Sequence, residues 1–354
     1  ASTAQAGILE NTPRLDYSGG ASCPALLLEP LRTNIVDDSE YVTGYFSQAS
    51  AVVSYNEIIS PEGVQNAFKL TSTTNGQARI EKSRPVGGTD TYTLSVFLKA
   101  GNSNFGSLAN FNGGASVRFN LADGTIQGSG GLIDSDIIPI GNDGWYRCYM
   151  VFQEKVSQTA NIYKILVSSD GETYFANNGD YIYGYGAQLE LGSYPTSYIP
   201  TMGSAVTRSG DNTGAIDVSS LGVTTGYTLF YELGDFNVAF GGVWLAQAGG
   251  GDRPYQVYGA TAVIKTNSGD AYPFNHGTLG KGTGIKVAVN YDGTNINVFT
   301  NGTKRGTWAA NKTIWDALTD LDMNLSSVQM VNWKQLLVFP TALTDSECIA
   351  LTTI

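Results

Sequence analysis

The chain has 354 residues, of which 42% are hydrophobic and 14% are charged, and its formal net charge at pH 7 is −11. A chain of this length and hydrophobic content can bury the cores of two domains, which excludes bulk disorder. The negative charge weighs against nucleic-acid binding, which requires a basic surface. No apolar run reaches the roughly 18 residues of a membrane span, so membrane insertion is not expected.

Short strands separated by turns are predicted through the first half of the chain. Asn-Gly at 75–76 and Asp-Gly at 123–124 and 143–144 are typical turn dipeptides, because these residues adopt a positive φ at low cost. Many short strands with such turns, and no helical periodicity between them, predict a sandwich or jelly roll. The predicted strands are residues 67–71, 78–82, 92–100, 116–120, 145–152, 161–167 and 181–191.

A domain boundary is predicted near residues 204–213, where Gly, Ser, Asp and Asn cluster between two series of strands. The predicted domains are therefore 1–209 and 210–354. The strands predicted for the second domain are residues 227–233, 243–246, 255–258, 262–265, 285–291, 296–300 and 333–339. The predicted fold class is all-β: two antiparallel β-sandwich (jelly-roll) domains with few short helices.

Two short helices are expected within the second domain. Apolar residues recur at i, i+4 and i+7 over residues 313–321, which is the periodicity of a helix face. Thr344 and Glu347 form a T-x-x-E capping box, which predicts the start of a terminal helix because the two residues satisfy each other's backbone amides.

Catalytic and metal-binding motifs are scarce. Cys23, Cys148 and Cys348 lie far apart, which weighs against a disulfide framework or a zinc ribbon, and a buried thiol is expected at Cys148. The single histidine, His276, lies in a predicted loop and has no G-x-S-x-G partner motif. No E-x-D-x-x-E strand supplies the paired carboxylates of a glycoside hydrolase. The chain is therefore predicted not to be an enzyme, and a hydrolase or lyase with carboxylates from separate strands is the alternative left open.

Several ordered blocks of the first half resemble one family. The closing strand contains Gln-Leu-Glu at 188–190, and the tail after it contains Thr-Ser-Tyr-Ile-Pro-Thr at 196–201. Upstream blocks lie at residues 13–17, 26–34, 92–100 and 144–147. In this order they resemble phage virion proteins whose β-sandwich is similar to carbohydrate-binding modules. The resemblance covers about residues 7–209.

The second half resembles laminin-G-like and concanavalin-A-like jelly rolls over about residues 212–354. The resemblance rests on successive hairpins at 287–302, with Asp-Gly and Asn-Gly turns, and on a closing strand, turn and helix at 336–347. It implies a second β-sandwich without identifying a ligand.

These resemblances imply a virion surface protein of a phage, in a tail fibre or appendage and assembled in the bacterial cytoplasm. Its expected activity is adhesion to host or environmental polysaccharide through non-catalytic domains, without a cofactor. The expected partners are a polysaccharide or other glycan and other virion proteins, and the expected assembly is a homotrimer. One alternative is a structural capsid-decoration or fibre-scaffold protein that contacts only virion proteins. The other is a polysaccharide depolymerase.

The candidate sugar-binding residues are aromatic rings with polar neighbours on turn-rich segments. Sugars place apolar CH faces on Trp and Tyr rings, and their hydroxyls need amide or charged groups beside the ring. Core packing is the commoner role of any one ring. The candidates are Tyr174, Asn177 and Asp180 in the first domain, and Trp244, Arg253, Tyr255 and Tyr258 in the second.

A structural calcium ion is what the resemblance to jelly-roll binding modules implies, because such modules hold an ion between their first and last strands. The residues expected there are Glu10, Asp16, Gln188 and Glu190. Solvated acidic side chains are the simpler interpretation of these residues and the favoured one.

Overall fold

The computed structural model describes most of the chain and confirms the predicted all-β fold class. The strands between residues 242 and 275 are described by their backbone. No helix in the described part is long and apolar enough to cross a membrane. The described residues are 14–16, 24–85, 87–155, 160–169, 174–211, 213–223, 225–234, 242–246, 253–258, 261–265, 271–275, 284–310, 315–316, 318–325 and 330–353.

The chain forms two compact units. One comprises Arg32–Arg208, and the other combines Pro13–Leu31 with Ser209–Ile354. The sequence assigned residues 13–31 to the first domain, but strand β2 (Ala25–Leu28) pairs antiparallel with β27 (Val331–Phe339). The second unit is therefore built from two separate stretches of sequence.

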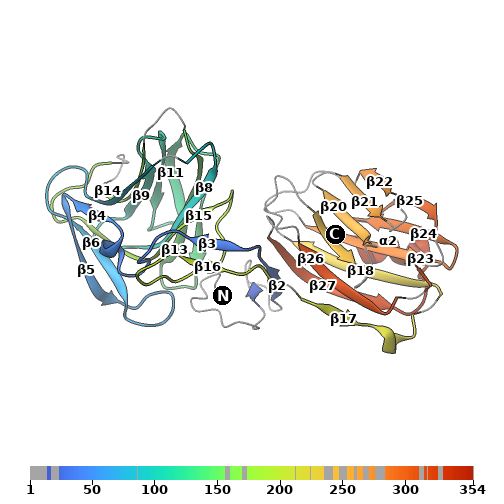
Figure 1. Cartoon of the computed structure of the whole chain (residues 1–354). Helices are drawn as coiled ribbons and strands as arrows, with labels where there is room; N and C mark the ends of the chain where they lie inside the picture. Colours follow the sequence, from blue (N-terminus) through green and yellow to red (C-terminus); the bar gives the residue numbers. More distant parts are fainter. Residues whose placement is uncertain are drawn as a thin grey trace. The chain divides into compact units, whose positions relative to one another are not determined.

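The first unit consists of two six-stranded antiparallel sheets packed face to face (Figure 1). A continuous core of buried residues from both sheets lies between them, including Leu94, Val96 and Leu98 of β8 and Leu108 and Ile165 of the other sheet. The first sheet has the order β12 (Asp134–Ile140), β13 (Trp145–Gln153), β8 (Thr91–Ala100), β15 (Tyr181–Leu191), β6 (Ala67–Ser72), β5 (Ala51–Ile58). The second has the order β11 (Thr125–Gly130), β10 (Ala115–Asn120), β9 (Phe105–Asn110), β14 (Ala160–Ser168), β7 (Arg79–Pro85), β4 (Ser47–Ala49).

The second unit also has two antiparallel sheets. Its core includes three aromatic rings in mutual contact, those of Tyr227, Tyr291 and Trp315. One sheet has the order β1 (Leu15–Asp16), β2, β27 (Val331–Phe339), β18 (Tyr227–Gly234), β23 (Ile285–Tyr291), β24 (Asn295–Thr300), β25 (Thr303–Ala309). The other has the order β17 (Ala215–Asp217), β26 (Asp320–Leu325), β19 (Gly242–Ala246), β20 (Arg253–Tyr258), β21 (Thr261–Lys265), β22 (Ala271–Asn275).

Local sequence signals explain several elements of the second unit. Asn301 and Gly302 both have positive φ in the two-residue turn between β24 and β25, as the Asn-Gly pair predicts. Helix α2 (Asp345–Thr352) begins at the predicted capping box. The helix predicted over 313–321 is wrong at its C-terminal end, because the chain is already in strand β26 from Asp320 onward. The apolar spacing there does not mark a helix face, but Leu318 and Leu321 are both buried in the core of the second unit.

Two of the three cysteines are buried thiols, which confirms the expectation for Cys148. Burial raises the pKa of Cys148 well above its ordinary value. Cys348 lies on α2 and packs against Ala288 and Phe299. Cys23 and His276 lie outside the described residues.

Candidate functional site

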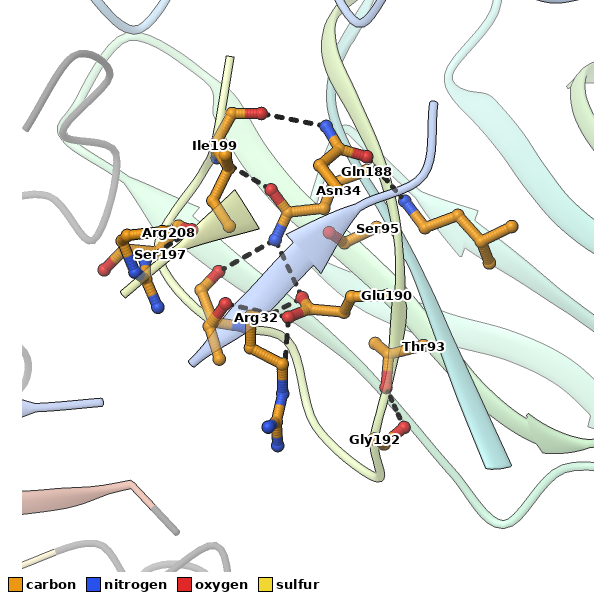
Figure 2. A network of polar contacts seen from close by, with 12 residues as sticks. Arg32, Asn34, Thr93, Ser95, Gln188, Glu190, Gly192, Ser197, Ile199 and Arg208 are labelled. Atoms are coloured by element: carbon orange, nitrogen blue, oxygen red, sulfur yellow. Dashed lines mark hydrogen bonds and ion pairs between the residues drawn. The ribbon is translucent and has the colours of Figure 1, made fainter. Parts of the chain in front are cut away.

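Most of the blocks that carry the resemblance to phage virion proteins contribute to one network on the outer face of the β8–β15 sheet (Figure 2), whereas residues 13–31 belong to the second unit. We call this network the latch, because it fastens the tail after β15 onto the sheet. Its side chains come from β3 (Arg32–Asn34), β8, β13 and β15, and β3 is itself paired with β16 (Val206–Arg208). The latch residues are Arg32, Asn34, Ser95, Arg147, Gln188, Glu190, Thr196, Ser197, Ile199 and Arg208.

Glu190 is the charged centre of the latch and is fully buried. Its Oε1 accepts hydrogen bonds from Gln188 Nε2 at 2.7 Å and from the Thr196 amide at 2.9 Å. Its Oε2 accepts from Thr196 Oγ1 at 2.8 Å and lies 3.8 Å from Arg32 Nε. A buried carboxylate is tolerated only when it is paired and hydrogen-bonded, and protein groups meet that requirement here.

Two amide side chains hold the tail by its backbone. Asn34 donates from Nδ2 to the carbonyls of Ala187 and Ile199, at 3.2 and 2.8 Å, and its Oδ1 accepts from the Leu189 amide. Gln188 Oε1 accepts from the Ile199 amide at 2.8 Å. The conspicuous sequence motif is therefore explained by closure of the sandwich, and these side chains are turned to the protein's own backbone.

The residues expected at a calcium site do not all belong to one unit. Asp16 belongs to the second unit, where its buried Oδ2 accepts from Asn332 Nδ2 at 2.6 Å. Gln188 and Glu190 belong to the first unit and to the latch, and Glu10 lies outside the described residues. Within the described part of the chain, no three acidic, histidine or cysteine side chains are grouped as metal ligands.

The predicted Tyr174 lies at an exposed aromatic cluster. Its ring meets that of Phe111 edge to face, with the centroids 6.5 Å apart and an interplanar angle of 79°. Phe111 is 50% exposed, and the adjacent Phe175 is 40% exposed. The ammonium group of the buried Lys164 lies 4.0 Å from the Phe111 centroid and 3.7 Å from the Glu81 carboxylate. We call Phe111, Tyr174 and Phe175 the aromatic loop surface.

The other two residues predicted beside Tyr174 have different roles. The Asp180 carboxylate accepts from the Asn177 amide at 2.8 Å, from Asn177 Nδ2 at 3.1 Å and from Ser169 Oγ at 3.3 Å, so it closes the turn. Asn177 is exposed, as are the neighbouring Asn178 and Asn75. The loop therefore presents exposed amide side chains near the aromatic cluster, held in place by Asp180.

Phe111 and Lys164 were not among the candidates that the sequence predicted, although the sequence around Phe111 offered an indication. Phe111 interrupts an Asn-rich turn between β9 and β10, where an aromatic residue has no core to fill. Lys164 lies within a strand and gave no signal, because its contact with Phe111 depends on how the turn folds back over the sheet.

The candidates in the second unit lie on two neighbouring strands. Trp244 is in β19, opposite Gln256 of β20, and Arg253, Tyr255 and Tyr258 are all in β20. The backbone thus brings these four positions to one hairpin. Their side chains lie outside the described part, so their contact with sugar stays a prediction.

A pair of carboxylates that the sequence treated as unrelated meets in the first unit. Asn66 Nδ2 donates to Glu40 Oε2 and to Glu62 Oε2, each at 3.3 Å, and Tyr185 donates to Glu40 Oε1 at 3.2 Å. Burial raises the pKa of Glu40, and the charge of Glu62 adds to the rise. The exposed ring of Tyr41 lies beside this pair in sequence. No spacing signal links positions 40 and 62, which lie on different loops.

Comparison with known proteins gives distant structural likenesses. No protein-family model and no curated protein matches the chain. A binding domain of botulinum neurotoxin DC in complex with SialylT matches 38% of this chain and 36% of its own, with 12% identity and a TM-score of 0.31. The CBM40 of Ruminococcus gnavus IT-sialidase, bound to alpha2,3 sialyllactose, matches 41% of this chain and 94% of its own, with 13% identity and a TM-score of 0.31. Sheep galectin-11 in complex with glycerol matches 35% and 94%, with 12% identity and a TM-score of 0.28. The chain spans little more than a third of the neurotoxin structure, and likenesses of this strength do not identify a function.

Proposed function

We propose that this chain is a non-catalytic adhesion protein that binds polysaccharide through exposed aromatic rings of its first unit. The observation that carries the proposal is the aromatic loop surface, where Phe111 and Tyr174 meet edge to face and Phe111 is half exposed. Rings at this exposure are not needed to fill a core, and they leave apolar faces in contact with water.

The chemistry beside the rings suits a sugar. Pyranose CH faces stack on aromatic rings, and by analogy with base–aromatic stacking each ring contributes on the order of 1–3 kcal/mol. The exposed amide oxygen of Asn177 offers an acceptor to sugar hydroxyls, while its Nδ2 donates to Asp180 and Ser169. A single shallow site of this kind binds weakly, and several copies acting together raise its avidity.

The proposed biological setting is the surface of a phage particle, as part of a homotrimeric tail fibre or appendage together with other virion proteins. Its support is the sequence resemblance, and the residues that carry that resemblance, such as Asn34 and Glu190, belong to the latch. A capsid-decoration or scaffold role in the same setting would need no glycan. Light scattering of the full chain tests the trimer, and a monomer at micromolar concentration would contradict it.

Glycan-array binding of the full chain tests the adhesion function. Phe111→Ala and Tyr174→Ala are expected to lower affinity for the bound polysaccharide by about fivefold or more, from the stacking energy above. Tyr41→Ala is a matched control, because Tyr41 is a similarly exposed ring (49%) elsewhere on the same unit. Absence of glycan binding would favour the scaffold role. Release of reducing sugar that is lost in Glu40→Gln or Glu62→Gln would favour a depolymerase instead.

A further inference from the structure

The outer face of the β8–β15 sheet is divided into a covered half and an open half. Along β15 the side chains of residues 181, 183 and 185 alternate onto this face. Tyr185 is 1% exposed beneath the tail, and Gln188 and Glu190 beyond it on β15 are fully buried. Tyr181 and Tyr183 are only partly buried. The tail thus leaves the β6–β15–β8 end of the sheet in contact with solvent.

Two lysines flank Tyr183 on this open half. Tyr183 is directly opposite Lys69 of β6 and directly opposite Lys99 of β8. Side chains of opposing residues lie on the same face with Cβ atoms about 5 Å apart. Lys69 Nζ also lies 4.1 Å from the centroid of the Tyr181 ring. We call Lys69, Tyr181, Tyr183 and Lys99 the open sheet face.

The two tyrosines are held in a fixed arrangement. Their rings meet edge to face, with the centroids 5.5 Å apart and an interplanar angle of 75°. The Tyr181 ring lies against the backbone of Gly101, where an added Cβ would be 2.4 Å from two ring carbons. The ring position therefore depends on a glycine in the β8–β9 connection, and the surface is formed before any ligand arrives.

The charge at this face is unusual for a protein with a net charge of −11. Among the described residues, none of the ion pairs involves Lys69 or Lys99. The carboxylate of Glu57 also acts at this face: burial raises the pKa of Tyr183, and Tyr181 and the charge of Glu57 add to that rise. Two lysines therefore flank a tyrosine, and within the described part of the chain neither has a carboxylate partner in an ion pair.

We propose that the open sheet face binds an anionic sugar, with the ring of the sugar on Tyr183 or Tyr181 and its carboxylate or sulfate held by Lys69 and Lys99. An ammonium group is a point charge that contacts either anion, so the shared chemistry is a negatively charged substituent on a pyranose. At physiological salt the Debye length is about 8 Å, so the distant negative charges of the protein are screened while these two lysines act at contact. This proposal deepens the glycan-binding function proposed above but uses a different face of the same unit.

Calorimetry of the full chain with three length-matched oligosaccharides tests the proposal: one neutral, one built of uronic acids and one sulfated. We expect an acidic oligosaccharide to bind more tightly than the neutral one and to lose affinity as salt is raised. Lys69→Gln and Lys99→Gln should each weaken acidic binding about two- to fivefold, which is the range of an exposed ion pair. Glu57→Gln should strengthen acidic binding, because it removes the opposing charge. Binding of the neutral oligosaccharide should be unchanged in all three variants.

The outcomes separate this proposal from the general function. If neutral glycan binds and Phe111→Ala abolishes it, while neither acidic oligosaccharide binds better than the neutral one, the adhesion function stands and the anionic site is wrong. If acidic binding is unaffected by both lysine variants, the anionic site is also wrong. Binding of no glycan at all overturns both. The uronic and sulfated arms show which anion is preferred.

Discussion

Arg32 and Glu190 form an ion pair in which both side chains are almost completely buried, with Arg32 Nε 3.8 Å from Glu190 Oε2. The guanidinium of Arg32 also lies over the ring of Tyr194, 5.1 Å from its centroid. The pair links β3, at the start of the first unit, to β15, its closing strand. Loss of the pair should therefore lower the unfolding free energy of the whole unit.

We expect Arg32→Ala to destabilise the first unit by about 3–5 kcal/mol, because it leaves the Glu190 carboxylate buried without its cation. Urea denaturation of the full chain measures the loss. Arg79→Ala serves as the control, since Arg79 and Glu81 are both more exposed and such a pair contributes about 0–1 kcal/mol. Equal losses of unfolding free energy in the two variants would contradict this prediction, because the buried pair would then contribute no more than the exposed one.

The stability of the first unit should fall as pH rises through the pKa of Glu40. The fold raises this pKa above its ordinary value of 4.5, so the protonated form is favoured in the folded state. The stability that protonated Glu40 contributes is fully present below the pKa of this residue in the unfolded chain. It is lost as pH rises through the higher pKa that Glu40 has in the folded chain. Glu62→Gln should therefore stabilise the unit at pH 7. It should also make the unfolding free energy depend less on pH above pH 4.5.

Denaturation at several pH values between 4 and 8 measures this effect, and Glu57→Gln provides an exposed carboxylate as the control. Parallel pH profiles for the wild-type chain and for both Glu40→Gln and Glu62→Gln would mean that the two carboxylates do not interact. The Asn66 hydrogen bond is kept in each variant, because Gln retains an acceptor oxygen.

Residues 13–31 should be required for the second unit to fold. Arg14 pairs with Glu29 at 3.3 Å and also with Asp211, and Leu28 belongs to the core. A chain of residues 210–354 would expose the β27 edge, and exposed edges promote aggregation. We expect this fragment to be aggregated or unfolded, and a peptide of residues 13–31 added in trans to restore a cooperative thermal transition. A scrambled peptide is the control, and a fragment that is soluble and folded by itself would contradict the prediction.

The thiols of Cys148 and Cys348 should resist alkylation in the folded protein. Burial raises the pKa of Cys348 to about 11, with nearby acidic side chains adding to the rise, and burial also raises the pKa of Cys148 well above its ordinary value. At pH 8 only about one part in a thousand of the Cys348 thiol would be the reactive thiolate. Mass spectrometry after maleimide treatment should show both sites labelled in denaturant and neither labelled without it.

Local signals in the sequence predicted local structure well. The Asn301–Gly302 turn and the Thr344 capping box were found where expected, because each depends on residues within a few positions of one another. The all-β fold followed from many such signals taken together. The boundary near residue 209 also had a compositional signal.

Relationships that depend on strand register could not be predicted. The juxtaposition of Lys69, Tyr183 and Lys99 requires knowing that β15 lies between β6 and β8, and in which register. The meeting of Glu40 with Glu62 depends on two loops, and the incorporation of β2 beside β27 joins the two ends of the sequence. The motif with the strongest family signal, around Glu190, proved to fasten the fold, because side chains with many protein partners are as constrained as those that bind a ligand.

The pairing of β2 with β27 also has a consequence for synthesis on the ribosome. Leu26 has Trp333 as its partner, which is synthesised after the whole of the first unit. The first unit can assemble as soon as Ile199 has emerged to meet Asn34. The leading segment must then wait, with its apolar residues unpaired, until β27 has emerged from the ribosome. The second unit is therefore expected to close after the first unit, although residues 13–31 are synthesised earlier.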